Sequence, residues 1–168
     1  SWVKSFATTP VAIARAGNVI GGGDWAADRI IPDLVNAYSS NQLPTLRYPD
    51  AIRPWQHVLD CLNGYQKLIS KMLSDGISGE WNFGPLLHEK HSVVQLVETF
   101  ANSWGVAGKE QAWKLEQIAQ PHEAGYLLLD SSKARLKLSW EDKFDFGSSI
   151  NLTASWFKQS QTQKPLEI

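Results

Sequence analysis

The feature that most constrains this chain is a short apolar strand that runs directly into a glycine-dense loop. Residues 14–25 read Ala-Arg-Ala-Gly-Asn-Val-Ile-Gly-Gly-Gly-Asp-Trp, so three consecutive glycines follow a β-branched pair. Glycine lacks a Cβ and adopts positive φ freely, and three in succession cost backbone entropy that a purely structural turn rarely requires. In α/β proteins, ligands bind in the crevice outside the carboxyl ends of the strands. The run therefore predicts a small-molecule site at this strand end.

Two other interpretations of the glycine run stay open. Residues 21–26 satisfy the G-x-G-x-x-A pattern of a dinucleotide-binding loop, and they follow a strand as that pattern requires. However, Asp24 and Trp25 stand where a pyrophosphate needs bare amide groups and a helix N-terminus. The other interpretation is a loop that only reverses the chain, although isolated turns rarely use three glycines followed by an aromatic residue. We favour a loop that lines a ligand site.

Composition and charge narrow the class of partner. The chain has 168 residues, of which 43% are hydrophobic and 20% charged, which is enough for one compact core. Its net charge is −1 and the charges are scattered singly, which argues against nucleic acid or a membrane as partner. Cys61 is the single cysteine, which fits a reducing cytoplasm, and the histidines lack metal-ligand spacing. We expect a cytoplasmic protein with a small-molecule partner and no metal site.

Alternating strand and helix signals predict an α/β fold. The signals favour strands at 11–16, 45–47, 80–84 and 113–118, and helices at about 30–39, 58–75, 93–104, 131–138 and 145–157. Gly76 ends the longest helix, whose apolar residues recur at helical spacing, and Ser92 with Gln95 forms a capping box. We expect the last strands of a doubly wound, Rossmann-type parallel sheet and a small α/β substrate-binding lobe. Residues 159–168 resemble a frayed polar tail.

Several segments in a fixed order carry a resemblance to a known family. They are residues 14–25, 28–32, 53–58, 81–85, 121–124 with 129–130, and 132–135. In these segments the chain resembles the extended short-chain dehydrogenase/reductase superfamily, and within it most closely the CDP-glucose 4,6-dehydratases. The resemblance covers nearly the whole chain. It departs from the family pattern at Ser139 and at the residue after Trp140, where no proline follows, and both positions are distant in sequence from the glycine loop.

The catalytic Tyr-x-x-x-Lys pair of this family is not found in the sequence. The residues four positions after each of its tyrosines, Tyr38, Tyr48, Tyr65 and Tyr126, are Gln42, Ile52, Ile69 and Asp130. The resemblance implies that this pair and the dinucleotide fingerprint lie upstream of residue 1. The chain is thus expected to be the C-terminal segment of one extended short-chain dehydrogenase/reductase domain.

The resemblance implies an NAD-dependent lyase as the complete enzyme. Hydride would pass from C4 of the glucosyl ring to NAD, water would leave across C5 and C6, and the hydride would return to C6. The product would be CDP-4-keto-6-deoxyglucose. NAD would be held mainly outside this segment, with Ala16 as a contact from within it. The resemblance also implies a homo-oligomer and a role in lipopolysaccharide O-antigen biosynthesis.

Arg53 and Asn18 are the two leading candidates for binding the nucleotide sugar. CDP-glucose presents two phosphates, and the guanidinium group of Arg53, beside Trp55, is the leading candidate for them. An isolated arginine is more often a surface or structural residue, but the family uses the arginine of this segment on the substrate phosphates. The family uses the amide at the position of Asn18 on the substrate near the nicotinamide. From the residues alone, Asn18 capping the glycine turn is an equal alternative.

Five further residues are secondary candidates for substrate binding. Arg29, Arg47 and its neighbour Leu46 are candidates for contacts to phosphate and base. Asn82 lies between two aromatic residues in a predicted strand, where alternation turns its side chain away from theirs. His122 lies in a segment that resembles the one that closes over the ligand in this family. The alternative is that His122 is a solvated loop residue.

Two functional alternatives remain. The first is another nucleotide-sugar dehydratase or epimerase of the same superfamily. The second is a stand-alone binding module that stacks carbohydrate on its eight tryptophans. Against the second, Trp104 and Trp156 fall on apolar helix faces and Trp140 follows a leucine-rich stripe, so we expect them in the core.

Overall fold

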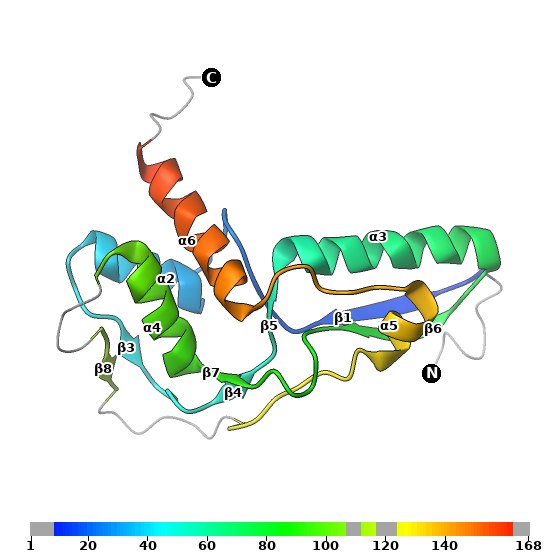
Figure 1. Cartoon of the computed structure of the whole chain (residues 1–168), viewed down its shortest axis with the longest axis horizontal. Coiled ribbons are helices and arrows are strands. Elements are labelled where there is room, and N and C mark those ends of the chain that lie inside the picture. The colour runs from blue at the N-terminus through cyan, green and yellow to red at the C-terminus, as the bar shows by residue number, and fades with distance from the viewer. Residues whose placement is uncertain (1–8, 107–111, 117–123, 163–168) are drawn as a thin grey trace.

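The structure is a computed structural model that describes residues 9–106, 112–116 and 124–162 (Figure 1). Its strands are β1 (Ala12–Ala16), β2 (Asn18–Ile20), β3 (Thr45–Leu46), β4 (Ile52–Arg53), β5 (Trp55–His57), β6 (Gly79–Phe83), β7 (His91–Ser92) and β8 (Lys114–Leu115). Its helices are α2 (Ile30–Ser39), α3 (Val58–Asp75), α4 (Val93–Trp104), α5 (Ser132–Leu138) and α6 (Phe146–Thr162). This mixture of strands and helices confirms the predicted α/β class.

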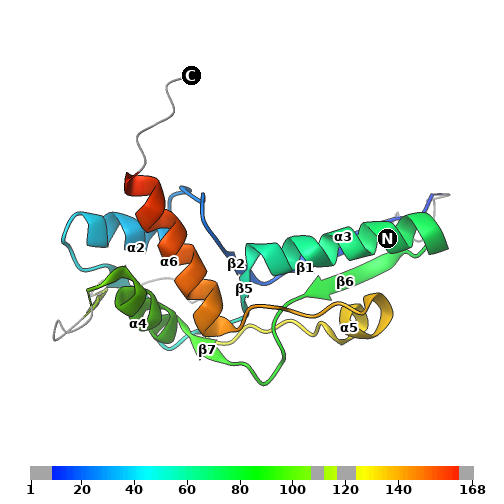
Figure 2. The same cartoon turned by 45° about the horizontal axis from the view of Figure 1, so that its top comes forward.

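The strands pair mostly in parallel. β1 pairs with β6 from Ala12↔Gly79 to Ala16↔Phe83, and β2 pairs with β5 through Asn18↔Trp55. β3 and β8 are also parallel, whereas β4 and β7 are antiparallel. Parallel pairing requires a crossover connection, and the crossover from β1 to β6 includes α3. Figure 2 shows α3 lying along β1 and β6.

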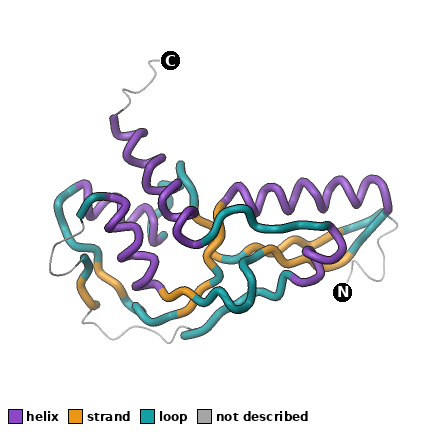
Figure 3. Tube along the Cα trace, in the orientation of Figure 1, coloured by secondary structure: helices purple, strands orange, loops and turns teal. Residues whose placement is uncertain are grey.

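Two hydrophobic cores divide the structure. One lies between α3, α5 and β6 and consists of Leu68, Trp81, Phe83, Ala134, Leu138 and Trp140. The other is larger and gathers residues of α2, α4 and α6 with β2, β3 and β5. Figure 3 shows these two groups of helices at opposite ends of the molecule, joined by strands and loops. The division matches the expected sheet portion and second lobe, but the core of that lobe is the larger of the two rather than the smaller.

Local signals place the ends of the main helices as predicted. At the start of α3, the His57 side chain accepts a hydrogen bond from the backbone N–H of Leu59 (3.3 Å), and Gly76 ends the helix at a φ of 63°. Ser92 and Gln95 form the predicted capping box of α4. Asp145 accepts a hydrogen bond from the backbone N–H of Ser148 (2.7 Å) at the start of α6. These contacts satisfy backbone groups that a helix end leaves unpaired.

Expectations about the end of the chain and about one strand need correction. α6 continues to Thr162, so residues 159–162 form a helical turn rather than part of a frayed tail. The side chain of Gln161 donates a hydrogen bond to the Ser39 hydroxyl (2.7 Å), which ties this turn to α2. Of the strand expected at 113–118, only the two residues of β8 are strand, and residues 117 and 118 lie outside the described residues.

The prediction that the tryptophans lie in the core was too broad. Trp140 is fully buried as expected, but Trp156 is 44% exposed. Likewise, the apolar stripe of α3 is only partly covered, because Leu62, Ile69 and Leu73 are exposed. Helical spacing shows which residues share a side of a helix, whereas coverage depends on what packs there. Among the helices that the structure describes, none has the length and apolarity that crossing a membrane requires.

Candidate functional site

A cleft of about 890 Å³ lies between residues 21–28, which we call the glycine loop, the start of α2, and the segment around β3 and β4. Five residues predicted to bind substrate line this cleft: Asn18, Arg29, Leu46, Arg47 and Arg53. Its volume falls within the range of small-molecule sites, about 300 to 1,000 Å³. The structure thus brings together side chains from segments that are well separated in the sequence.

The close approach of two backbone segments places Asn18 near Arg53. A Cβ on Gly17 would lie only 2.3 Å from the carbonyl oxygen of Pro54, so a larger residue does not fit there. The backbone N–H of Asn18 donates to the same oxygen (2.9 Å), and β2 continues beside β5. Glycine at position 17 therefore allows the strand end that carries Asn18 to lie against the residue that follows Arg53.

Arg53 is a buried cation in the cleft wall. The residue is 7% exposed, and its Nη1 donates to the carbonyl oxygen of Ile52 (2.9 Å). Its backbone pairs with that of His91 on β7. Burial limits the movement of the side chain, and a guanidinium group with N–H groups in a planar fork suits phosphate oxygens. The structure thus provides a restrained cation facing a cleft.

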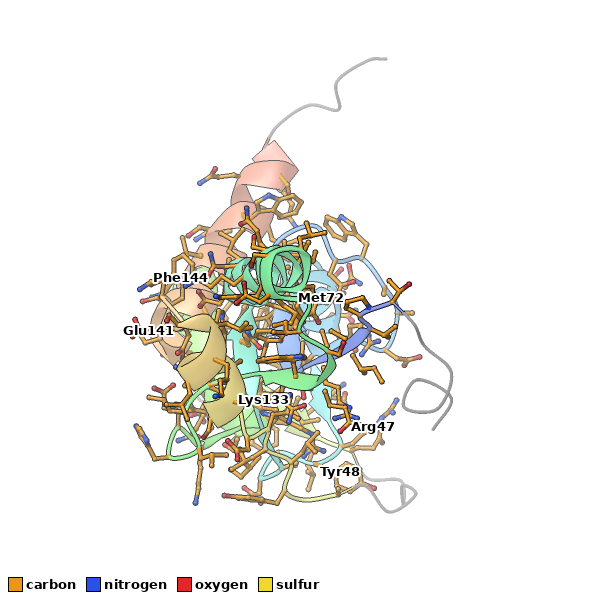
Figure 4. All side chains as sticks on the ribbon, turned by 90° about the vertical axis from the view of Figure 1, so that its right-hand side faces the viewer. Arg47, Tyr48, Met72, Lys133, Glu141 and Phe144 are labelled. Carbon is orange, nitrogen blue, oxygen red and sulfur yellow. The ribbon has the colours of Figure 1, made fainter. Side chains whose placement is uncertain are left out.

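The rim of the cleft has both signs of charge. Nη2 of Arg47 lies 3.8 Å from Oδ1 of Asp28, and both side chains are mostly exposed, so this ion pair contributes little to stability. Partial desolvation raises the pKa of Asp33, nearby Asp28 raises it further, and Arg47 lowers it. In Figure 4, Arg47 and Tyr48 lie close together, on the opposite side of the view from Phe144. An anionic ligand here meets cations that carboxylates already partly neutralise.

Side chains from distant segments of the sequence pack directly against the glycines of the glycine loop. A Cβ on Gly21 would lie 2.5 Å from a methyl carbon of Val58, and a Cβ on Gly22 would lie 2.2 Å from the indole ring of Trp156. The prediction that these glycines make room for a ligand is therefore incomplete, because intramolecular packing alone requires them. The loop nevertheless lines the cleft with Gly21, Gly22, Asp24, Ala26 and Asp28.

The loop does not have the geometry of a dinucleotide-binding turn. The carboxylate of Asp24 accepts a hydrogen bond from the backbone N–H of Ala26 (3.0 Å), so Asp24 rather than Asn18 forms the local turn. α2 begins only at Ile30, after Asp28 in a left-handed conformation with a φ of 60°. No helix N-terminus therefore follows the glycines directly, as the dinucleotide pattern requires.

Three predicted residues are not brought to the cleft. Asn82 lies on β6, where its side-chain N–H group donates to the carbonyl oxygen of Asp130 (3.1 Å). Its partner is thus the segment before α5, and Asn82 does not line the cleft. Ala16 ends β1 opposite Phe83 and also lies outside the cleft lining. His122 lies outside the described residues.

Sequence reasoning missed several polar residues of the cleft, among them Asp33 and Tyr48. Asp33 follows Arg29 by one helical turn, and its backbone N–H donates to the Arg29 carbonyl oxygen (3.0 Å). This i, i+4 spacing was the available signal. Tyr48 stands beside Arg47, and no pattern in that short segment distinguishes it.

No protein-family profile matches the chain. It is 41% identical over 150 residues to a CDP-glucose 4,6-dehydratase of Salmonella typhimurium, a match that covers 88% of this chain and 41% of that protein. A UDP-glucose 4-epimerase of Bacillus subtilis is 28% identical over 61% of this chain and 28% of its own length.

Among solved structures, two similar ones are enzymes in complex with NAD. A UDP-glucuronic acid 4-epimerase of Bacillus cereus, with a fluorinated UDP-sugar also bound, matches with a TM-score of 0.78 and 20% identity, over 95% of this chain and 48% of that one. A dTDP-glucose 4,6-dehydratase of Bacillus anthracis matches with a TM-score of 0.77 and 21% identity, over 96% and 48%.

The fold is therefore that of the Rossmann-type nucleotide-sugar epimerases and dehydratases. Within that class, the chain is related in sequence to CDP-glucose 4,6-dehydratase, which confirms the resemblance found in the sequence. It spans 41% of the length of that relative and about half of the solved structures.

Proposed function

We propose that this chain supplies the nucleotide-sugar pocket of a CDP-glucose 4,6-dehydratase. The observation that carries the proposal is the cleft, which gathers a buried arginine, an amide and an apolar wall in one space of suitable volume. The relationship to CDP-glucose 4,6-dehydratase supports the choice of ligand. A cytoplasmic location and a homo-oligomeric state, which the resemblance implies, belong to the same proposal.

The lining residues suit the separate parts of a nucleotide sugar. Arg53 provides a restrained guanidinium fork for the diphosphate, and Arg29 and Arg47 add positive charge at the rim. Leu46 is 2% exposed and provides an apolar surface for the base. Asn18, at the start of β2, offers an amide to the sugar hydroxyl groups. Together these residues would hold the sugar ring in one orientation.

The chemistry that bound NAD would supply is reversible hydride transfer: a hydride would leave C4 of the sugar and, after loss of water across C5 and C6, would be returned to C6. The resemblance gives Ala16, at the end of β1, as the contact that this chain would make with NAD. The chain has no Tyr-x-x-x-Lys pair for proton transfer. The role that we assign to it is therefore to bind and orient the substrate, which lowers the entropic part of the barrier.

Competition between nucleotides tests the proposal. We expect CDP to bind about tenfold or more tightly than UDP or dTDP, because a pocket that pairs with the amino edge of cytosine leaves polar groups unpaired with uracil or thymine. The measurement is calorimetric titration of the protein, expressed at its full natural length, at fixed salt. CDP-glucose should then give a 4-keto product when NAD is present.

Each other outcome rejects a defined part of the proposal. Equal affinity for the three nucleotides would remove the CDP-specific assignment and favour an epimerase or dehydratase with another base. Absence of binding by all three would reject the cleft as a nucleotide-sugar site. Nucleotide binding without any 4-keto product would favour the binding-module alternative.

A further inference from the structure

The glycine loop rests on two adjacent aromatic residues of α6. The Cα of Gly22 lies against the indole ring of Trp156, since an added Cβ would lie 2.2 Å from two of its ring atoms. Gly23 lies near the far edge of the same ring, where an added Cβ would be 3.7 Å away. The ring of Trp25 meets that of Phe157 edge to face, with 5.0 Å between ring centroids. α6 thus contacts the loop at both ends of residues 22–25.

The two aromatic residues of α6 differ in burial. Phe157 is fully buried, whereas Trp156 is 44% exposed, and their rings are in edge-to-face contact at 5.1 Å. Phe157 therefore belongs to the core, while the ring of Trp156 contacts Phe157 and also contacts the glycine loop. Figure 1 shows the segment after β2 rising beside α6. A half-exposed tryptophan gains less stability from burial than a fully buried one.

The same loop forms one wall of the cleft. Gly21, Gly22, Asp24, Ala26 and Asp28 all line the cleft. Three consecutive glycines have wide conformational freedom, and the exposed ion pair between Asp28 and Arg47 is a weak restraint. Without a rigid support the loop would sample many positions. The wall that the loop provides would then not be preformed.

We propose that Trp156 is a positioning residue for the nucleotide-sugar cleft. Its indole ring supports the glycine loop at Gly22 and so sets the position of the wall that the loop provides. The inference rests on the proposed function, because the ligand is the nucleotide sugar assigned to this cleft. Trp156 itself does not line the cleft, so it acts through the loop and not by contact with ligand.

Four single variants and one double variant test this role, with CDP as the probe and the protein at its full natural length. Trp156→Ala removes the support, and Gly22→Ala displaces the loop from the other side. Each should weaken CDP binding about tenfold. Trp156→Phe keeps a ring under Gly22 and should bind within about twofold of wild type. Leu136→Ala, at a position on α5 that is 80% exposed, is the control and should bind unchanged.

The double variant Gly22→Ala, Trp156→Ala distinguishes a shared mechanism from two separate defects. If both changes act on the loop, the affinity of the double variant for CDP should be no lower than that of the single variant with the lower affinity. The reason is that the methyl group added at position 22 no longer meets an indole ring. Additive losses would contradict the proposal. Thermal unfolding of each variant without ligand reports the structural contribution separately.

Two further results would overturn the inference. If Trp156→Ala lowers the melting temperature but binds CDP as wild type does, the residue is merely structural and the proposed function stands. If wild-type protein itself binds neither CDP nor CDP-glucose, the proposed function fails and the inference fails with it. Should Trp156→Ala not fold, Gly22→Ala and Trp156→Phe still give opposite expected results.

Discussion

Arg53 occupies the position in which a single side chain matters most for the proposed function. We expect Arg53→Ala to weaken CDP-glucose binding about tenfold to a hundredfold, since a charge-assisted hydrogen bond contributes roughly 1.5 to 3 kcal/mol. NAD binding should change little. Calorimetry with each ligand measures both effects. Arg15→Ala is the matched control, because Arg15 pairs with Glu80 on the surface and does not line the cleft.

An equal loss of affinity for both ligands would mean that Arg53 stabilises the fold and does not bind the diphosphate. A lower melting temperature without ligand would indicate the same. Since Arg53 is 7% exposed, that measurement is a necessary part of the test.

His57 makes the stability of the fold depend on pH. Burial lowers the pKa of His57, and Asp60 opposes that shift. Burial also lowers the pKa of His91. A histidine whose pKa is lower in the folded state binds its proton more readily when unfolded. Its contribution to stability is therefore complete above a pH of about 6.5 and decreases as the pH falls below that value.

We accordingly expect the free energy of unfolding to decrease between pH 7.5 and pH 5.5 in urea titrations. His57→Asn should reduce this dependence, because asparagine retains an acceptor at the start of α3 but does not titrate. An unchanged pH dependence in His57→Asn would show that other groups cause it.

Helix α4 offers a test at the scale of one element. Ser92 accepts a hydrogen bond from the backbone N–H of Gln95 (3.3 Å), and Gln95 Oε1 accepts one from the backbone N–H of Ser92 (2.8 Å). Ser92→Ala should lower the free energy of unfolding by about 1 kcal/mol, because it leaves a backbone donor at the helix start without its partner. Chemical denaturation measures the change. Ser70→Ala, on the exposed surface of α3, should change stability by less than about 0.5 kcal/mol.

A loss in Ser92→Ala no larger than that in Ser70→Ala would mean that packing alone holds the start of α4. Leu96, Val97 and Phe100 of this helix are all fully buried, so packing is the competing explanation.

At the scale of the whole molecule, the function that we propose for these 168 residues is to bind substrate, and their sequence contains no Tyr-x-x-x-Lys pair. We expect the purified 168-residue chain to form no 4-keto product from CDP-glucose, even with NAD supplied, because positioning without acid–base chemistry leaves most of the barrier in place. Absorbance of the 4-keto sugar under alkaline conditions measures the product. Any turnover above that of a buffer control would contradict the prediction and would show that residues of this chain perform the acid–base step.

The sequence by itself determined the features that depend on neighbouring residues. The capping box at Ser92, the end of α3 at Gly76 and the start of α6 after Asp145 are all where the sequence predicted them. The reason is that caps and turns are made by residues a few positions apart, whose chemistry can be read directly. The order of strands and helices, and the resemblance in ordered segments, likewise required only the sequence.

Only the tertiary structure decided which of those residues meet. It placed Asn18, Arg47 and Arg53 around one cleft but turned Asn82 toward the carbonyl oxygen of Asp130. It also showed that Gly22 accommodates the indole ring of Trp156. A glycine in the sequence records that space is needed but not what occupies it, because the occupant comes from a distant segment through packing.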